Sequence, residues 1–175
     1  MRRHKGFTLI ELLVVISIIS LLTMVVLASL SNARNRAKIA KARSELNNIA
    51  SAVMLLVDNT GRLPSSSSTK TIESSCTAHG EEVVLTADSA GINNTDGAFP
   101  GWNGPYMKVP SDPWGNAYTY DDDYNCSAAP TALGCANYGG NNNLRAVYSP
   151  GPNGSGINVY DSDNIIRVLC SHQAL

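Results

Sequence analysis

A long apolar segment near the amino terminus constrains this chain more than any other feature. From Phe7 to Leu30 the only charged residue is Glu11, and neither proline nor glycine occurs. About 20 apolar residues in a helix cross the roughly 30 Å hydrocarbon core of a bilayer. A cleaved secretory signal would have a short apolar core followed by small residues, whereas this run continues into further helical sequence. The segment is therefore expected to insert into a membrane.

The helical pattern continues beyond Leu30. Apolar residues recur there at spacings of three and four, at Ile39, Ala42, Leu46, Ile49, Val53, Leu56 and Val57. Such spacing marks one face of a helix, so a single helix is predicted from Phe7 to Asn59, with an amphipathic second half that packs on the rest of the chain. Glycine at 61 suits a left-handed cap and proline at 64 cannot continue the helix, so both favour its end at this point.

The second part of the sequence is typical of a small β-sheet. Short runs of β-forming residues, separated by Gly, Asn, Pro and Asp, occur at 117–120, 144–148, 157–160 and 165–169. Residues 83–85 fit a strand or part of a short helix equally well. These features predict an α+β fold, in which a long amino-terminal helix, membrane-spanning in its first half and amphipathic in its second, packs on a small antiparallel sheet.

Charge is distributed unevenly along the chain, although the net charge is only −1. Five basic residues lie within ten positions after the apolar segment, at Arg34, Arg36, Lys38, Lys41 and Arg43. From Asp58 onward there are twelve acidic and five basic residues, and the run Asp121 to Asp123 is expected to be a solvated strand end. The segment 139–143 lacks the Lys and Ser/Thr of a phosphate loop, and no specific nucleic-acid binding is evident.

Few residues could support enzyme chemistry. Beyond His4, the histidines are His79 and His172, which lie close to Cys76 and Cys170 respectively. Zinc binding or a Cys/His nucleophile pair could use such residues, but the spacings match no pattern for either. Disulfide bonds in an exported head explain the cysteines better, and the chain is predicted not to be an enzyme.

Four cysteines allow three pairings. The favoured pairing joins Cys126 to Cys135, which closes a short loop, and Cys76 to Cys170, which ties the middle of the chain to its carboxyl terminus.

The start of the apolar segment resembles the processing site of type IV prepilins. It reads Lys5-Gly6-Phe7-Thr8-Leu9-Ile10-Glu11. The resemblance implies that a prepilin peptidase cuts between Gly6 and Phe7 and methylates the new amino terminus. A carboxylate at the depth of Glu11 costs about 2.5 to 3.5 kcal/mol on insertion scales and marks a function with a nearby partner. The amine of Phe7 in a neighbouring subunit is the expected partner, and the pair would set the register of assembly.

Two further stretches resemble the major pseudopilin of type II secretion. They are Asn59–Pro64 at the helix exit and Gly101–Lys108 continuing through Asp112–Tyr118. The resemblance implies a structural subunit of a type IV pilus-like filament. The alternatives are a surface pilus pilin, acting in adhesion, motility or DNA uptake, and a single-span anchored binding protein. The chain departs from the pattern of this family at two positions. It has Ala28 where the family commonly has proline, and Ser20 where the family often has glycine.

The resemblance also implies an organisation and a location. Residues 1–6 form a cleaved basic leader, 7–31 a transmembrane and filament-core helix, 32–59 an amphipathic helix half, and 60–175 an exported globular head. The chain is expected in the bacterial inner membrane, with the leader inside and the head outside, because large domains translocate with little regard to charge. Its expected partners are other copies of itself in a helical polymer, the peptidase, the inner-membrane assembly platform and, before assembly, membrane lipid.

Calcium is the expected cofactor, and no other is predicted. Major pseudopilins bind this ion in a carboxy-terminal loop, which Ser149–Gly154 together with Asp161–Asp163 resembles. Calcium takes six to eight oxygen ligands. Asn153, Asp161 and Asp163 could supply them together with backbone carbonyls, although the family usually has aspartate at the position of Asn153. The same residues would also serve simply as turn formers.

Overall fold

A computed structural model of the chain describes residues 6–64, 80, 82–138 and 144–171. The chain divides into two compact units, Met1–Lys38 and Ile39–Leu175. The helix α1, Leu9–Thr60, runs continuously from the first unit into the second. It agrees with the predicted single helix to within two residues at each end, and together with a small antiparallel sheet it confirms the α+β fold.

In the first unit, α1 exposes its apolar side chains. Leu9 is 85% exposed and Leu21 is 68% exposed, and by length and composition this helix could cross a membrane. The hydroxyl groups of Ser17, Ser20 and Thr23 donate hydrogen bonds to backbone carbonyls three or four residues earlier, at 2.7 to 2.8 Å. These polar groups are therefore satisfied within the helix, which is what an apolar surrounding requires.

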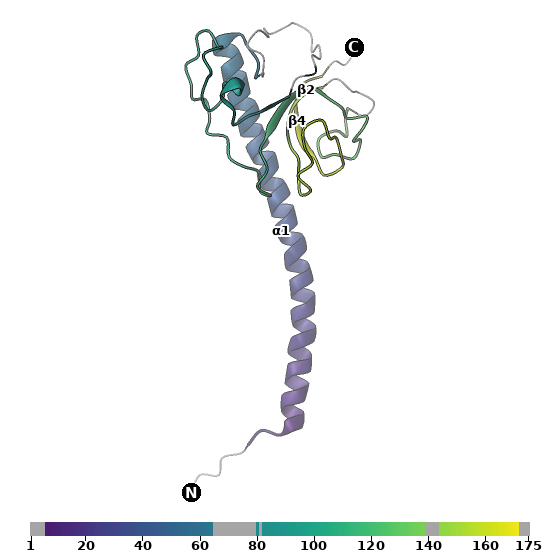
Figure 1. The fold of residues 1–175 in the computed structure, drawn as a ribbon. Coiled ribbons are helices and arrows are strands. Elements are labelled where there is room, and N and C mark those ends of the chain that lie inside the picture. The colour runs from purple at the N-terminus through teal and green to yellow at the C-terminus, as the bar shows by residue number, and fades with distance from the viewer. Residues whose placement is uncertain (1–5, 65–79, 81, 139–143, 172–175) are drawn as a thin grey trace. The chain divides into compact units, whose positions relative to one another are not determined.

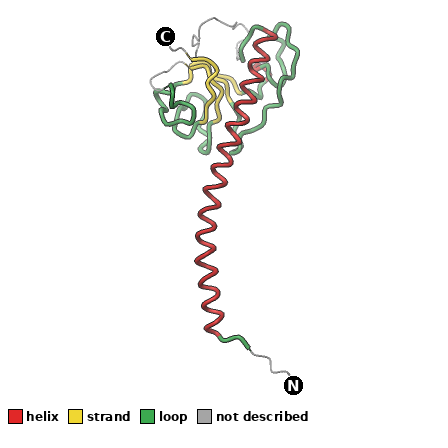
Figure 2. Tube along the Cα trace, turned by 180° about the vertical axis from the view of Figure 1, so that it is seen from behind, coloured by secondary structure: helices red, strands yellow, loops and turns green. Residues whose placement is uncertain are grey.

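The second unit contains a four-stranded antiparallel sheet. Its strands are β1 Glu82–Val84, β2 Thr119–Tyr124, β3 Leu144–Ser149 and β4 Ile165–Ser171, in the order β1-β2-β3-β4. Figure 1 labels β2 and β4 of this sheet. The end of α1 lies beside this sheet (Figure 2). The buried core between them contains Leu46, Ile49, Val53, Leu56, Tyr118, Tyr120 and Val147. The apolar stripe of the helix is thus covered by the sheet, as predicted.

The prediction of a strand at 157–160 is wrong, because these residues form a turn and an irregular segment. Asn158 has φ of 61°, a left-handed conformation that interrupts an extended chain. Its backbone N–H donates to the carboxylate of Glu82 at 3.0 and 3.1 Å instead of to a strand. The predicted strand at 117–120 begins later, at Thr119, and the undecided segment near Val83 is the edge strand β1.

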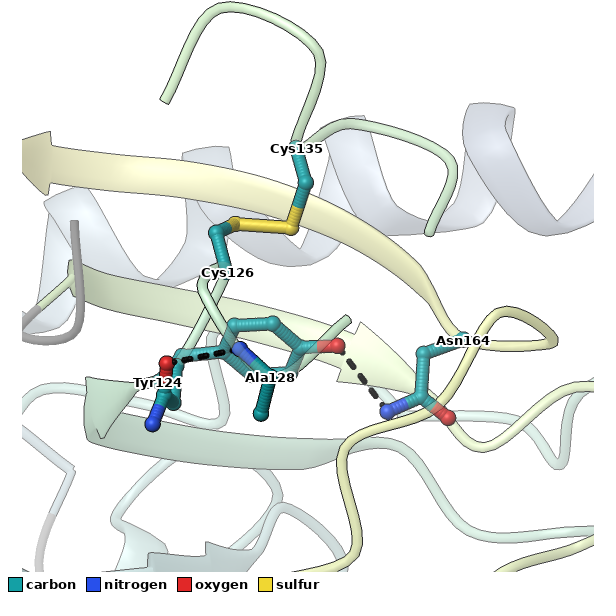
Figure 3. The surroundings of a disulfide bond; sticks show 6 residues. Tyr124, Cys126, Ala128, Cys135 and Asn164 are labelled. Carbon is teal, nitrogen blue, oxygen red and sulfur yellow. Dashed lines mark hydrogen bonds between the residues drawn. A yellow bond between two sulfur atoms is a disulfide. The ribbon is translucent and has the colours of Figure 1, made fainter. Parts of the chain in front are cut away.

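The opposite face of the sheet carries a second apolar cluster under the loop 125–138. The cluster contains Tyr124, Cys126, Ala129, Ala132, Cys135, Leu144, Tyr148 and Ile166. Cys126 and Cys135 form a disulfide bond, which confirms this pairing (Figure 3). The second predicted disulfide bond, between Cys76 and Cys170, lies outside the described residues, because the structure does not describe Cys76 or the side chain of Cys170.

Candidate functional site

The amino terminus of α1 holds the predicted processing and assembly residues. Gly6 and Phe7 precede the helix and are exposed, and Phe7 is 85% exposed. The peptide bond between them is therefore outside the hydrogen-bond network of the helix and is accessible to a peptidase. Cleavage at this bond, and the assembly roles of Phe7 and Glu11, stay predictions.

Glu11 has a hydrogen-bond partner within its own chain, Thr8, in addition to the amine expected from a neighbouring subunit. Its Oε2 accepts from the backbone N–H of Thr8 at 2.9 Å and from the Thr8 hydroxyl at 2.8 Å, and the N–H of Glu11 donates to the Thr8 hydroxyl oxygen at 3.3 Å. This reciprocal arrangement is a capping box, which satisfies backbone N–H groups at a helix start. The pattern Thr8-x-x-Glu11 was readable in the sequence. In the single chain, the carboxylate of Glu11 is therefore bound by its own helix end.

The predicted head motif anchors its loops on α1. Tyr118 is fully buried, and its hydroxyl donates to Oε2 of Glu45 at 2.6 Å. Burial, and then the neighbouring Glu45 carboxylate, raise the pKa of the Tyr118 phenol above its usual value. Trp114 packs partly buried against the same core, and Asn59 near the helix end donates to the hydroxyl of Tyr106 at 3.2 Å. The motif thus fixes the loop to the helix.

The predicted calcium loop is closed by its own hydrogen bonds. Oδ2 of Asp161 accepts from Nδ2 of Asn153 at 2.7 Å and from the hydroxyl of Ser155 at 2.6 Å, while its Oδ1 accepts from the N–H of Asp163 at 3.0 Å. Oδ1 of Asn153 accepts from the N–H of Ser155 at 2.9 Å. As arranged, the carboxylate oxygens of Asp161 and the side-chain amide of Asn153 are engaged in hydrogen bonds within the loop. Calcium at this loop stays a prediction.

The close approach of Gly151 to the backbone of Asp163 allows a test of how much this loop contributes to stability. Gly151 has φ of 75°, and a Cβ added there would lie 2.0 Å from the carbonyl oxygen of Asp163. Gly151→Ala is expected to lower the free energy of unfolding by about 2 kcal/mol or more, since it adds a backbone clash to left-handed strain. Thermal unfolding of the full chain in detergent measures the loss.

The matched control for that loss is Gly97→Ala. Gly97 also has a positive φ, 89°, but no atom lies within 4 Å of an added Cβ. This control isolates the backbone strain and is expected to cost about 1 kcal/mol. Equal losses in the two variants would show that the contact with Asp163 is not a constraint.

The acidic run on β2 differs from the expected solvated strand end. Asp121 is fully buried and Asp122 is 3% exposed. Asp121 and Asp123 lie together with Glu82 of β1 in a group of three carboxylates. Burial, together with the Asp123 and Glu82 carboxylates, raises the pKa of Asp121 to about 9. Asp121 is paired with Ala146 of β3, and the register of the two strands shifts between Asp121 and Tyr124.

Two family models match separate parts of the chain. The prokaryotic N-terminal methylation motif matches residues 1–27, and the type II secretion system protein G matches residues 88–143. No curated protein and no solved structure matches the chain. The first match contains the predicted cleavage site and Glu11, and the second contains the loop motif and β2. The chain is therefore similar at its amino terminus to proteins with the prepilin methylation motif and in residues 88–143 to protein G, the major pseudopilin, and both families consist of structural filament subunits.

Proposed function

We propose that this chain is the major pseudopilin of a type II protein secretion system. The observation that carries the proposal is the match of residues 88–143 to the protein G model, in a chain that also has the methylation motif. The structure adds a physical reason. The matched region includes Tyr118, which binds Glu45 of α1, so the matched loops hold the head to the helix that would form the filament core.

In this proposal, the chain begins as an inner-membrane protein with its leader inside and its head outside. Prepilin peptidase removes residues 1–6 and methylates Phe7, and an assembly platform then moves the subunit from the lipid into a helical homopolymer. The exposed apolar surface of α1 supports this path, because the same side chains can contact lipid before assembly and neighbouring helices afterwards. A disulfide bond at Cys126–Cys135 also suits a head exposed to an oxidising compartment.

A surface pilus pilin is the second candidate. It is favoured by the loop 125–138, a disulfide-closed segment on the face of the sheet opposite α1, which suits a subunit exposed to the exterior. The two candidates predict different phenotypes for the same deletion.

Deletion of the gene in its bacterial host separates these functions. For a major pseudopilin, export of secreted enzymes is expected to fall at least tenfold, with surface pili and pilus-dependent behaviour unchanged. Re-expression of the wild-type chain should restore export, which controls for effects on neighbouring genes. Normal export with loss of surface pili would instead support the pilin.

Processing gives a separate test of the first step. The mature chain is expected to lack residues 1–6 and to begin with N-methylated Phe7, and intact-mass measurement of the membrane-extracted protein reads both changes at once. A host strain without prepilin peptidase serves as the control, in which the chain should keep its leader. An unprocessed chain in the wild-type host would contradict the assignment.

A further inference from the structure

Three carboxylates gather between the edge strand β1 and β2. Glu82 and Asp121 are direct partners in the antiparallel register, and Asp123 follows two residues later on β2. One oxygen from each of the three lies within 4.8 Å of the others. Like charges directly opposite each other on neighbouring strands destabilise a sheet. Either a proton on Asp121, whose pKa is raised to about 9, or a bound cation would relieve this repulsion.

The protein itself leaves two of these oxygens without a partner. Asp121 is fully buried, its Oδ1 accepts from the N–H of Asp123 at 2.8 Å, and its Oδ2 is buried with no hydrogen-bond donor. Oδ1 of Asp123 is likewise buried without a donor. A buried carboxylate oxygen that lacks a partner is costly, and natural proteins normally pair such charges or bind a metal with them.

The donors that reach the group are neutral. The backbone N–H of Asn158 donates to Glu82, and the hydroxyl of Tyr160 reaches Oε1 of Glu82 at 3.4 Å. The ion pair between Lys41 and Glu45 involves none of the three carboxylates. Hydrogen bonds from one side thus satisfy Glu82, while the inner oxygens of the two aspartates receive none.

We propose that Glu82, Asp121 and Asp123 bind one divalent cation of the size of calcium. Calcium binds oxygen at 2.3 to 2.6 Å, so two ligands on opposite sides of the ion lie about 4.6 to 5.2 Å apart. Oxygens within 4.8 Å of one another can therefore share this ion without movement of the strands. Magnesium needs about 2.0 to 2.1 Å and a near-ideal octahedron, which three carboxylates on two strands satisfy less readily.

This site is separate from the loop of Asn153 and Asp161. There each oxygen of the Asp161 carboxylate already accepts a hydrogen bond, whereas here the inner oxygens lack donors. The consequence of binding also differs. An ion at the proposed site joins the three-residue edge strand β1 to β2 and, through Glu82, to the segment 158–160.

Terbium and calcium binding to the full chain in detergent test the proposal. Terbium(III) substitutes for calcium and emits when a nearby tyrosine is excited, and Tyr160 is in hydrogen-bond reach of Glu82. After chelator treatment, terbium is expected to give tyrosine-sensitised emission that calcium displaces at least tenfold more effectively than magnesium. At a calcium concentration of 100 times its Kd, the melting temperature should rise by about 10 °C. Absence of sensitised emission and of any shift at millimolar calcium would overturn the proposal.

Asp121→Asn is the decisive variant, because it removes the buried carboxyl group and keeps the shape. It is expected to abolish the calcium-induced shift and, in chelator, to melt at the same or a higher temperature than the wild type, since it relieves repulsion. A merely structural carboxylate would instead make this variant less stable in chelator. Asp123→Asn, at a partly exposed position, tests a second ligand of the proposed site. It should raise the Kd for calcium at least tenfold.

Asp161→Asn is the matched control, because it changes a carboxylate in the Asn153 loop and leaves the proposed site intact. It should leave unchanged both the terbium emission and the calcium-induced rise in melting temperature. If Asp161→Asn abolishes binding while Asp121→Asn keeps it, the ion belongs to the Asn153 loop and the proposed site is wrong.

Discussion

Glu11→Ala is expected to abolish filament formation while membrane insertion stays intact. A carboxylate in an apolar segment costs about 2.5 to 3.5 kcal/mol on insertion scales, so its removal does not hinder insertion. In the assembled state, the expected partner of the carboxylate is the amine of Phe7 in a neighbouring subunit, and the variant leaves this amine unpaired in apolar surroundings. Electron microscopy of sheared filaments measures assembly, and membrane fractionation measures insertion.

The capping box provides the matched control for this experiment. Thr8→Ala removes the hydroxyl that Glu11 contacts but keeps the carboxylate, and loss of an N-cap side chain costs about 1 kcal/mol of helix stability. This variant is expected to form filaments, because Glu11 remains free to bind a neighbouring amine. Equal loss of filaments in both variants would show that capping of α1 is what assembly requires. Normal filaments from Glu11→Ala would exclude the register role.

The elements that were predicted well have local causes. The helix α1 follows from an apolar run and then from apolar residues at spacings of three and four, with no glycine or proline from Phe7 to Asn59, and its end follows from Gly61. Gly61 has φ of 68°, and its N–H donates to the carbonyl of Val57 at 2.8 Å, as expected of a left-handed cap. The pairing of Cys126 with Cys135 was likewise predictable, because the two residues are only nine positions apart.

The elements that were missed depend on contacts between distant segments. Residues 157–160 have strand-forming side chains, but the N–H of Asn158 binds Glu82, 76 positions earlier. The strand β1 is too short for its period to be recognised, and it is fixed by its pairing with β2. No local pattern carries this information, since the same residues would form a strand or a turn depending on the partner.

The acidic group on β2 illustrates the same limit for a candidate site. Three consecutive aspartates are typical of a solvated strand end, and nothing within 119–124 indicates that Asp121 is fully buried. Asp121 lies on an inner strand, paired with Glu82 of β1 on one side and with Ala146 of β3 on the other, so its burial depends on strands distant in the sequence. The capping box at Thr8 and Glu11 is the opposite case, because its four-residue signature is local and could have been read directly.

Removal of the disulfide bond between Cys126 and Cys135 is expected to give the second large effect. The bond closes a loop over a separation of nine residues, and the chain-entropy relation gives about 2.6 kcal/mol of stabilisation for a loop of this length. The double variant Cys126→Ala with Cys135→Ala should therefore melt roughly 10 °C lower than the wild type. Alanine is chosen because both sites are fully buried and a serine hydroxyl there would need a partner.

The loss should be concentrated on the face of the sheet opposite α1. The loop covers the cluster around Tyr124, whose hydroxyl accepts from Nδ2 of Asn164 at 2.9 Å beneath the disulfide (Figure 3). Hydrogen exchange should therefore accelerate in 125–138 and at Asn164 before it does so in the helix-side core. Ser127→Ala, an exposed position within the same loop, is the control. Its free energy of unfolding should lie within about 0.5 kcal/mol of the wild-type value. Uniform acceleration in both clusters would show that the two faces of the sheet unfold as one unit, with the disulfide stabilising the whole head.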